Sequence, residues 1–299
     1  MFLEDNEQEK SQKIAHQYIL DLRGQKLIIG PEPWLVGILN VTPDSFSDGG
    51  EFKEADRAVA RALAMEEEGA RIIDIGGEST RPGSKGVEAA EEINRVIPVI
   101  KKLRLQTQTL ISIDTRKSQV AKAALEEGAD LVNDISALRH DPEMARLVAE
   151  FQVPVILMHM LGTPETMQQN PYYQEVLFDL KYFFVERIRQ AVEAGIPENR
   201  IIIDPGIGFG KTLEHNLRLI NNLDYFSDLR KPVMVGPSRK SFLGLILEAP
   251  IDQRLEGTLA AAIISLLRGA VLIRVHDIIQ TKRALRVAQS IVNEKKVGN

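Results

Sequence analysis

The sequence predicts a single-domain α/β protein of the TIM (β/α)8 barrel class with a short N-terminal extension. From residue 34 onward, short runs of Val, Ile and Leu alternate with longer amphipathic segments. This alternation is typical of a parallel sheet covered by helices. Eight such runs lie within about 240 residues, close to the length of a typical barrel, and no Pro-, Gly- or Ser-rich linker divides them. A doubly wound open sheet shows the same alternation and is the main alternative.

The eight expected strands share a short apolar run: 34–40, 71–75, 109–113, 130–133, 153–158, 200–204, 231–235 and 271–275. The segments between them have apolar residues three or four positions apart, as amphipathic helices do. In one of these segments Ala58, Ala62 and Met65 share a face and Gly69 is a natural stop. Residues 34–299 are expected to form the barrel, and residues 1–33 a helix and a hairpin that close its bottom.

Composition excludes several classes of function. The chain has 299 residues, of which 44% are apolar and 26% are charged, and its net charge of -5 argues against general nucleic-acid binding. The absence of cysteine excludes disulfides, thiolate nucleophiles and zinc–cysteine sites. Residues 1–10 do not resemble a secretory signal, and the longest apolar run, 259–267, is too short to span a membrane. We therefore expect a cytoplasmic protein that does not bind membranes.

Side chains that are polar, with the exception of Met158, lie at or after the end of every expected strand: Asn40; Glu78, Thr80 and Arg81; Asp114; Asn133 and Asp134; Met158 and His159; Asp204; Ser238, Arg239 and Lys240; Arg274 and His276. In a barrel all eight carboxyl ends meet on one face, where active sites lie. Any one of these residues, Asp114 for example, could simply cap the next helix. Lys and Arg are poor caps, however, so the set as a whole predicts a binding site.

Two kinds of loop bear on the ligand. The segment Gly206–Thr212 has three residues between Gly206 and Gly210, one too few for a phosphate-binding Walker loop, and Lys211 stands where a dinucleotide fingerprint needs Gly. ATP and NAD are therefore not expected. The glycines are expected to let backbone approach a flat ligand beneath Phe209. Loops 41–50 and 79–86 are long and rich in Pro, Gly and Ser, which is typical of mobile substrate loops.

Read together, eight motifs resemble the dihydropteroate synthase family, in order and over residues 34 to about 290: segments 37–50, 76–84, 111–121, 133–138, 158–168, 204–216, 236–244 and 274–277. The resemblance implies an enzyme that condenses 6-hydroxymethyl-7,8-dihydropterin diphosphate with 4-aminobenzoate, releasing diphosphate. It also implies Mg2+ as cofactor, and a homodimer formed through the later helices. Segment 254–268 is apolar around much of its circumference, which fits a dimer interface or ordinary barrel packing.

The resemblance assigns the pterin pocket to Asp114, Asn133, Met158, Asp204, Phe209, Gly236, Lys240 and Arg274. A pterin presents N3–H and its 2-amino group side by side, which suits one carboxylate, here Asp204. Asn133 would serve the pyrimidine edge, Asp114 would accept from the other ring, and Lys240 would donate to the 4-oxo oxygen and N5. Met158 and Phe209 would supply apolar walls.

The other substrate groups are assigned in the same way. Asn40, Arg274 and His276 would bind the diphosphate, with the Asn40 oxygen on the Mg2+. The expected contacts to 4-aminobenzoate are Pro43, Phe46, Thr80, Arg81, Phe209 and Ser238, and Asp48 is a weaker candidate for holding the closed loops or the metal's waters. The groups expected to act in catalysis are Asn40, Thr80, Arg81, Lys240, Arg274 and His276.

Two other functions remain open at this stage. A methyltransferase acting on methyltetrahydrofolate and a corrinoid would share the barrel and the pterin pocket but would not need groups that bind a diphosphate. A non-catalytic paralog that binds a pterin or a protein would be expected to lack Asn40, Arg81, Lys240 or His276, all of which are present.

Overall fold

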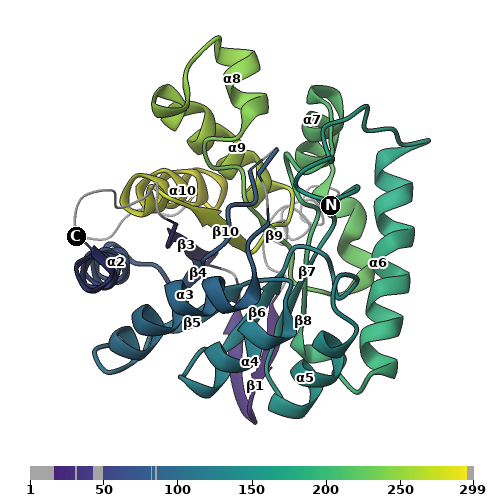
Figure 1. Ribbon diagram of the computed structural model, residues 1–299. Helices are drawn as coiled ribbons and strands as arrows, with labels where there is room; N and C mark the ends of the chain where they lie inside the picture. Colours follow the sequence, from purple (N-terminus) through teal and green to yellow (C-terminus); the bar gives the residue numbers. More distant parts are fainter. Residues whose placement is uncertain (1–16, 31, 43–49, 82, 85, 295–299) are drawn as a thin grey trace, which may run out of the picture.

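The computed structural model describes residues 17–30, 32–42, 50–81, 83–84 and 86–294. Eight parallel strands form one sheet in the order β8-β7-β6-β5-β4-β3-β10-β9. A single parallel bridge between Ile203 and Val233 joins the two ends of this sheet. The helices lie around the outside of the strands (Figure 1). This arrangement confirms the predicted (β/α)8 barrel and excludes the open doubly wound sheet.

The barrel strands lie where the apolar runs predict them: β3 Trp34–Asn40, β4 Ile72–Gly76, β5 Leu110–Asp114, β6 Leu131–Asp134, β7 Val155–Met158, β8 Ile201–Asp204, β9 Met234–Val235 and β10 Leu272–Val275. Strand β9 is shorter than the expected 231–235. Because Pro232 has no N–H, it cannot continue the ladder as a donor, and its carbonyl instead accepts from the Ile203 N–H at 3.0 Å.

The helices fill the intervening segments: α2 Gly50–Glu68, α3 Ala89–Arg104, α4 Ser118–Glu126, α5 Glu143–Phe151, α6 Val176–Glu193, α7 Leu213–Asn221, α8 Ser241–Leu247, α9 Leu255–Leu267 and α10 Ile278–Val292. Short 3-10 helices span Glu198–Arg200, Leu223–Leu229 and Ile251–Gln253. Within the described part of the chain, no helix combines the length and the apolar character that crossing a membrane would require.

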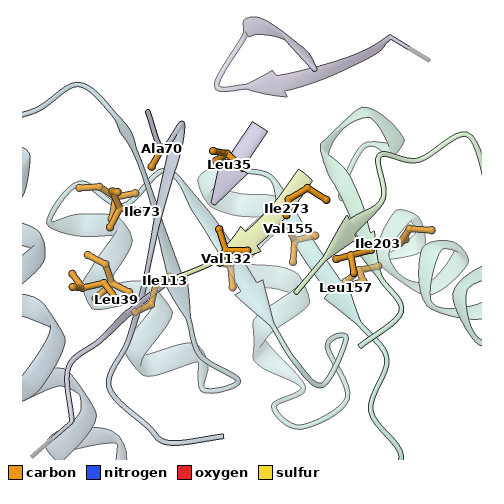
Figure 2. Close-up of a cluster of buried hydrophobic side chains, with 14 of the residues drawn as sticks. Leu35, Leu39, Ala70, Ile73, Ile113, Val132, Val155, Leu157, Ile203 and Ile273 are labelled. Atoms are coloured by element: carbon orange, nitrogen blue, oxygen red, sulfur yellow. The ribbon is translucent and has the colours of Figure 1, made fainter. Parts of the chain in front are cut away.

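Alternation along the strands separates two apolar layers. Outward-facing residues such as Ile113, Val132 and Leu157 belong to the large core between strands and helices, part of which is drawn in Figure 2. Inward-facing residues of seven strands fill the lower interior of the barrel: Val36, Ile72, Leu131, Ile156, Ile202, Met234 and Leu272. Leu110 of the eighth strand, β5, is partly buried against them. The same inward positions, two residues further along each strand, open onto the upper end of the barrel.

An antiparallel hairpin packs against the lower end of the barrel interior. It consists of β1 Tyr18–Leu22 and β2 Gln25–Ile29, joined by Arg23 and Gly24, both with positive φ. Leu20 and Ile29 are buried in the inward-facing cluster, and Asp21 accepts two hydrogen bonds from Arg200, at 2.8 and 3.0 Å. The helix that the sequence predicts within 1–33 has no counterpart in 17–30 and 32–33, and residues 1–16 and 31 lie outside the described residues.

We expect this hairpin to contribute to stability through its buried side only. Ile29→Ala should lower the free energy of unfolding by about 2–5 kcal/mol, because it leaves a cavity beneath the barrel. Ile28→Ala is the matched control: Ile28 is 60% exposed and Ile29 fully buried, so the control should stay within about 0.5 kcal/mol of the parent. Urea unfolding monitored by circular dichroism measures both values. Equal losses would mean that the hairpin does not plug the barrel.

Candidate active site

A cavity lies at the carboxyl ends of the barrel strands. It is lined by Thr80, Asp114, Asn133, Ile135, Met158, Asp204, Gly206, Ile207, Phe209, Gly236, Lys240 and Arg274. The structure therefore brings together all eight residues that the sequence assigned to the pterin pocket, together with Thr80. Ile135, Gly206 and Ile207 complete the lining. Gly206 belongs to the glycine loop that was expected to approach a flat ligand, whereas Ile135 and Ile207 were not identified from the sequence. Both lie within three residues of the end of a strand, β6 or β8, which is the signal that could have found them.

Strand alternation decides which polar residues face this cavity. Asn133 and Asp134 are neighbours at the end of β6, so they point to opposite faces. Asn133 faces the cavity, whereas both carboxylate oxygens of Asp134 accept hydrogen bonds from the turn that follows, one from Ser136 and the other from the Leu138 N–H at 2.8 Å. Asp134 therefore stabilises the loop after β6, and Asn133 is free to meet a ligand.

Arg274 is the centre of a buried polar network across the barrel. Its Nε donates to Asp74 Oδ2 at 2.6 Å, and its Nη2 donates to Asp114 Oδ2 at 2.7 Å. Asn133 Nδ2 also donates to Asp74 Oδ2, at 2.9 Å. Asp74 is fully buried. Because Asp114 pairs with Arg274 while Lys117 takes the N-cap position of α4, the alternative that Asp114 merely caps a helix is wrong.

Asp74 is the main polar residue of the site that the sequence analysis missed. It lies inside the apolar run of β4, between Ile73 and Ile75, rather than after the end of the strand. The available signal was its position: it has the same parity as the inward-facing Ile72. A charged residue at an inward position of a buried strand needs a partner, and Arg274 supplies it.

Burial brings the pKa values of several ionisable groups of the cavity close to neutral pH. Desolvation raises the pKa of Asp204 to about 6, against the opposing hydrogen bond from the Gly206 N–H and the charge of Lys240. Desolvation also raises the pKa of Asp114 to about 7, opposed by the charge of Arg274. Burial and then the charge of Arg274 lower the pKa of Lys240 to about 7. Such groups can gain or lose a proton near neutral pH when the hydrogen bonds of a ligand replace those of solvent.

The rest of the cavity combines apolar walls with an unused acceptor. Phe209 and Met158 belong to a separate cluster with Ile135 and two further methionines. The ammonium of Lys240 lies 3.9 Å from the centre of the Phe209 ring. The side-chain oxygen of Asn133 is buried and has no hydrogen-bond partner among the described residues. A flat ligand with ring N–H groups and apolar faces suits this combination.

The glycine-rich loop after β8 has a packing role that the sequence did not indicate. Gly206 has a φ of +66°, and a Cβ there would lie 2.0 Å from the carbonyl oxygen of His159. Gly210 has a φ of +64°, and a Cβ there would lie 2.9 Å from the Leu161 carbonyl oxygen. These two glycines permit close packing against the loop after β7. Gly206 also lines the cavity with Phe209, and its role toward a flat ligand stays a prediction.

His276 and Ser238 interact next to this cavity but do not line it. Ser238 Oγ lies 2.9 Å from His276 Nδ1 and accepts from the His276 backbone N–H at 3.3 Å. The Ser238 hydroxyl can donate to Nδ1 or accept from it, because its oxygen has a second lone pair besides the one that the backbone N–H uses. Burial, followed by the charges of Arg274 and Arg239, lowers the pKa of His276 to about 4. His276 is thus a neutral donor near pH 7.

Hydrogen bonds to Glu78 fix the loop that carries Thr80 and Arg81. Glu78 accepts from Arg116 at 3.0 Å, from Lys117 at 2.5 Å and from the Val87 N–H at 3.0 Å. Glu78 therefore closes the base of the loop instead of facing the cavity. Thr80 reaches the cavity, whereas Arg81 is exposed.

Asn40 and three residues of the loop after β3 were also assigned to the site from the sequence. Asn40 ends β3 beside Gly76 of β4 and does not line the cavity. Pro43, Phe46 and Asp48 lie outside the described residues. The individual roles assigned to the site residues stay predictions.

The Arg274 network should matter for folding as well as for binding. Asp74→Asn should lower the free energy of unfolding by about 3–5 kcal/mol, because it removes one partner of a buried ion pair. As a control, Glu143→Gln removes the partner of Arg146 on the surface and should change the value by less than about 1 kcal/mol. Both are measured by urea unfolding. A change in Asp74→Asn no larger than in the control would contradict the network's importance.

Comparisons with known proteins agree with this geometry. Residues 36–276 match the model of a family described as pterin binding enzyme. A curated dihydropteroate synthase from Haemophilus influenzae is 45% identical over 261 residues, covering 87% of this chain and 94% of the relative. The solved dihydropteroate synthase from Xanthomonas albilineans with 4-aminobenzoic acid has a TM-score of 0.86 and 44% identity, covering 92% of this chain and 98% of that one.

A second structure of the Xanthomonas albilineans enzyme, in complex with 7,8-dihydropteroate, has a TM-score of 0.82 and 43% identity over 91% of this chain and 98% of that one. Both sequence and fold therefore match over nearly the whole length of each relative. On this evidence the chain belongs to the dihydropteroate synthases of the pterin-binding enzyme family.

Proposed function

We propose that the protein condenses 6-hydroxymethyl-7,8-dihydropterin diphosphate with 4-aminobenzoate, forming 7,8-dihydropteroate and diphosphate. The observation that carries the proposal is the convergence of the predicted pterin residues on one cavity at the top of the barrel. The dihydropteroate synthase relatives, among them structures that hold 4-aminobenzoic acid and 7,8-dihydropteroate, support the same substrates.

The pterin fits the acceptors of the cavity. The Asp204 carboxylate accepts from the Gly206 N–H through Oδ1 at 2.7 Å, which leaves three lone pairs for the N3–H and 2-amino group of the pyrimidine ring. Asn133 offers its unpartnered oxygen and one remaining N–H, because its other N–H is used by Asp74. Lys240 donates to the 4-oxo oxygen and N5, and Phe209 covers a ring face.

The diphosphate meets the donors at the ends of β10 and β3. Arg274 uses Nε and Nη2 in the buried network, so its Nη1 is left for a phosphate oxygen. The imidazole of His276, which is neutral near pH 7, provides a second donor. As the bond between the pterin methylene and the diphosphate breaks, its electron pair leaves with the diphosphate, and these donors stabilise the growing negative charge.

We propose Mg2+ as the cofactor, held by the Asn40 side-chain oxygen together with the diphosphate. The described residues contain no group of three or more His, Asp or Glu side chains suited to a metal ion. A single amide oxygen fits a Mg2+ that keeps several waters and depends on substrate phosphates for its other ligands. When bound, Mg2+ would neutralise charge on the leaving diphosphate.

The second substrate enters from the loop side. Thr80 lines the cavity next to the pterin residues, which supports an approach of 4-aminobenzoate along the loop that follows β4. The aromatic amine is weakly basic and mostly unprotonated near neutrality, so its lone pair can form the C–N bond to the allylic-type cation on the pterin methylene without a strong base. The proton that the nitrogen then loses passes to the released diphosphate or to water. Phe209 and Met158 shield that cation from water.

The two alternative functions fit less well. Arg274 and Lys240 line the cavity and His276 lies next to it, an arrangement that a methyltransferase using methyltetrahydrofolate and a corrinoid would not need. A non-catalytic paralog would be expected to have lost Asn40, Arg81, Lys240 or His276, and all four are present.

Two further assignments accompany the function. We propose a homodimer that uses the exposed side of α9, where Ile264 and Leu267 are 43% and 41% exposed. The opposite side of this helix packs against α10, α7 and α8, so barrel packing accounts for much of its apolar surface. A cytoplasmic location stays a prediction.

The proposal is tested by the release of diphosphate from the pterin substrate. We expect release to require both Mg2+ and 4-aminobenzoate and to be accompanied by one dihydropteroate per diphosphate, measured by a coupled diphosphate assay and chromatography. Methyltetrahydrofolate with a corrinoid should give no methyl transfer. Pterin binding without any diphosphate release would favour the non-catalytic paralog instead.

The loop assignment makes a separate prediction. Arg81→Ala should raise the KM for 4-aminobenzoate by roughly tenfold, because a charged hydrogen-bonding contact to this substrate is lost, and Thr80→Ala should have a smaller effect in the same direction. Binding of the pterin diphosphate, measured by calorimetry, should stay within about twofold of the parent. Arg146→Ala, on the surface of α5, is the control. Loss of pterin binding in Arg81→Ala would overturn the loop assignment.

A further inference from the structure

A buried lysine behind the cavity has no role in the mechanism above. Lys211 is 3% exposed. Its Nζ lies 3.0 Å from the Phe209 carbonyl oxygen, 3.0 Å from His159 Nδ1 and 3.4 Å from the His159 carbonyl oxygen. An ammonium has three N–H groups and no acceptor, so three acceptors satisfy it. Buried lysines without such partners are rare.

The acceptors of Lys211 belong to two loops of the site. His159 follows β7, and its N–H donates to the Asp204 carbonyl oxygen at 2.9 Å. Phe209 lies in the loop after β8. This strand ends at Asp204, the carboxylate proposed to bind the pterin. Lys211 therefore joins the two strand ends behind Asp204 and holds the backbone that presents the Phe209 ring.

The surroundings keep His159 a neutral acceptor. Desolvation, followed by the charges of Lys211 and Arg139, lowers the pKa of His159 well below its ordinary value. Its ring packs edge-on against Phe183, with 4.7 Å between the ring centres, and its centre lies 5.8 Å from that of the Tyr173 ring. The Tyr173 hydroxyl donates to the Gly210 carbonyl oxygen at 2.8 Å. His159 and Tyr173 thus support the same loop from one side.

We propose that Lys211 is a positioning residue of the pterin site, whose ammonium fixes the Phe209 loop and provides a positive charge that keeps Asp204 ionised. The inference rests on the proposed function, because it assumes that ionised Asp204 binds the pterin. Lys211 does not line the cavity, so it acts through Phe209 and Asp204 and not by contact with a substrate.

The charges around both groups define the expected pH dependence. Asp204 faces Lys240, Arg274 and Lys211, all of which oppose the rise in its pKa to about 6. Lys211 itself is lowered to a pKa of about 7 by burial, with Asp204 acting in the opposite direction and Lys240 adding to the decrease. Pterin affinity should therefore rise with pH as Asp204 ionises through about 6. Removal of the Lys211 charge should move this midpoint upward.

The test uses the purified full chain and 6-hydroxymethylpterin as the probe, with affinity measured by calorimetry between pH 5 and 8. We expect Lys211→Met to raise the Kd at pH 7 on the order of tenfold and to move the pH midpoint upward. Lys231→Met is the matched control. Lys231 is 4% exposed and pairs with Glu198 at 2.7 Å, but it lies at the lower end of the barrel, so its loss should leave the Kd and the midpoint unchanged.

Other variants separate the possible failures. Asp204→Asn should remove the pH dependence in both backgrounds. If Lys211→Met does not fold, His159→Phe keeps the packing against Phe183 while removing one acceptor, and it should raise the Kd by several-fold. If folded Lys211→Met or His159→Phe has the affinity and the pH midpoint of the parent, the inference about Lys211 is wrong, and the proposed function is unaffected. Failure of the parent chain to bind the probe would instead contradict the proposed function.

Discussion

The buried ion pairs of Arg274 with Asp74 and Asp114 constrain the whole upper end of the barrel. Removing these charges from water is expensive, and the cost is offset only if the guanidinium and both carboxylates keep their geometry. The three residues come from β10, β4 and β5, so the network links strands that are not all neighbours. Any ligand in the cavity meets side chains whose positions are already set, which lowers the entropic cost of binding.

Strand register makes this network possible. Along β4, Ile72 faces the apolar lower interior and Asp74, two residues later, faces the polar network. Along β10, Leu272 and Arg274 have the same relationship. A shift of one residue in either strand would exchange the inner and outer faces and would place a charge among the apolar side chains under the helices. Packing below and polar contacts above therefore select the same register.

Sequence patterns predict most of this fold but only part of the site. Asp204 and Asn133 could be identified because they end apolar runs, and strand ends converge in a barrel. Asp74 could not be found in this way, since it interrupts a run, and its importance depends on Arg274, 200 positions away in the chain. In the sequence, Lys211 belongs to a segment that resembles a phosphate-binding loop but lacks its spacing. Its role could not be predicted, because its contact with His159 exists only after β7 and β8 have paired. Residues that act through partners distant in sequence require the structure.

The order of the strands also explains how one cavity can recognise two different chemical groups. Going round the barrel, the acid and amide side chains Asp74, Asp114, Asn133 and Asp204 stand on β4, β5, β6 and β8. The next arc carries Lys240 after β9, Arg274 on β10 and His276 directly after β10, followed by Asn40 at the end of β3, whose side-chain oxygen is the proposed ligand of Mg2+. A heterocycle rich in N–H groups suits the first arc, and a diphosphate suits the second. The bond to be broken would then lie at the boundary between the arcs, where positive charge on the carbon and negative charge on the leaving oxygen are each stabilised from their own side.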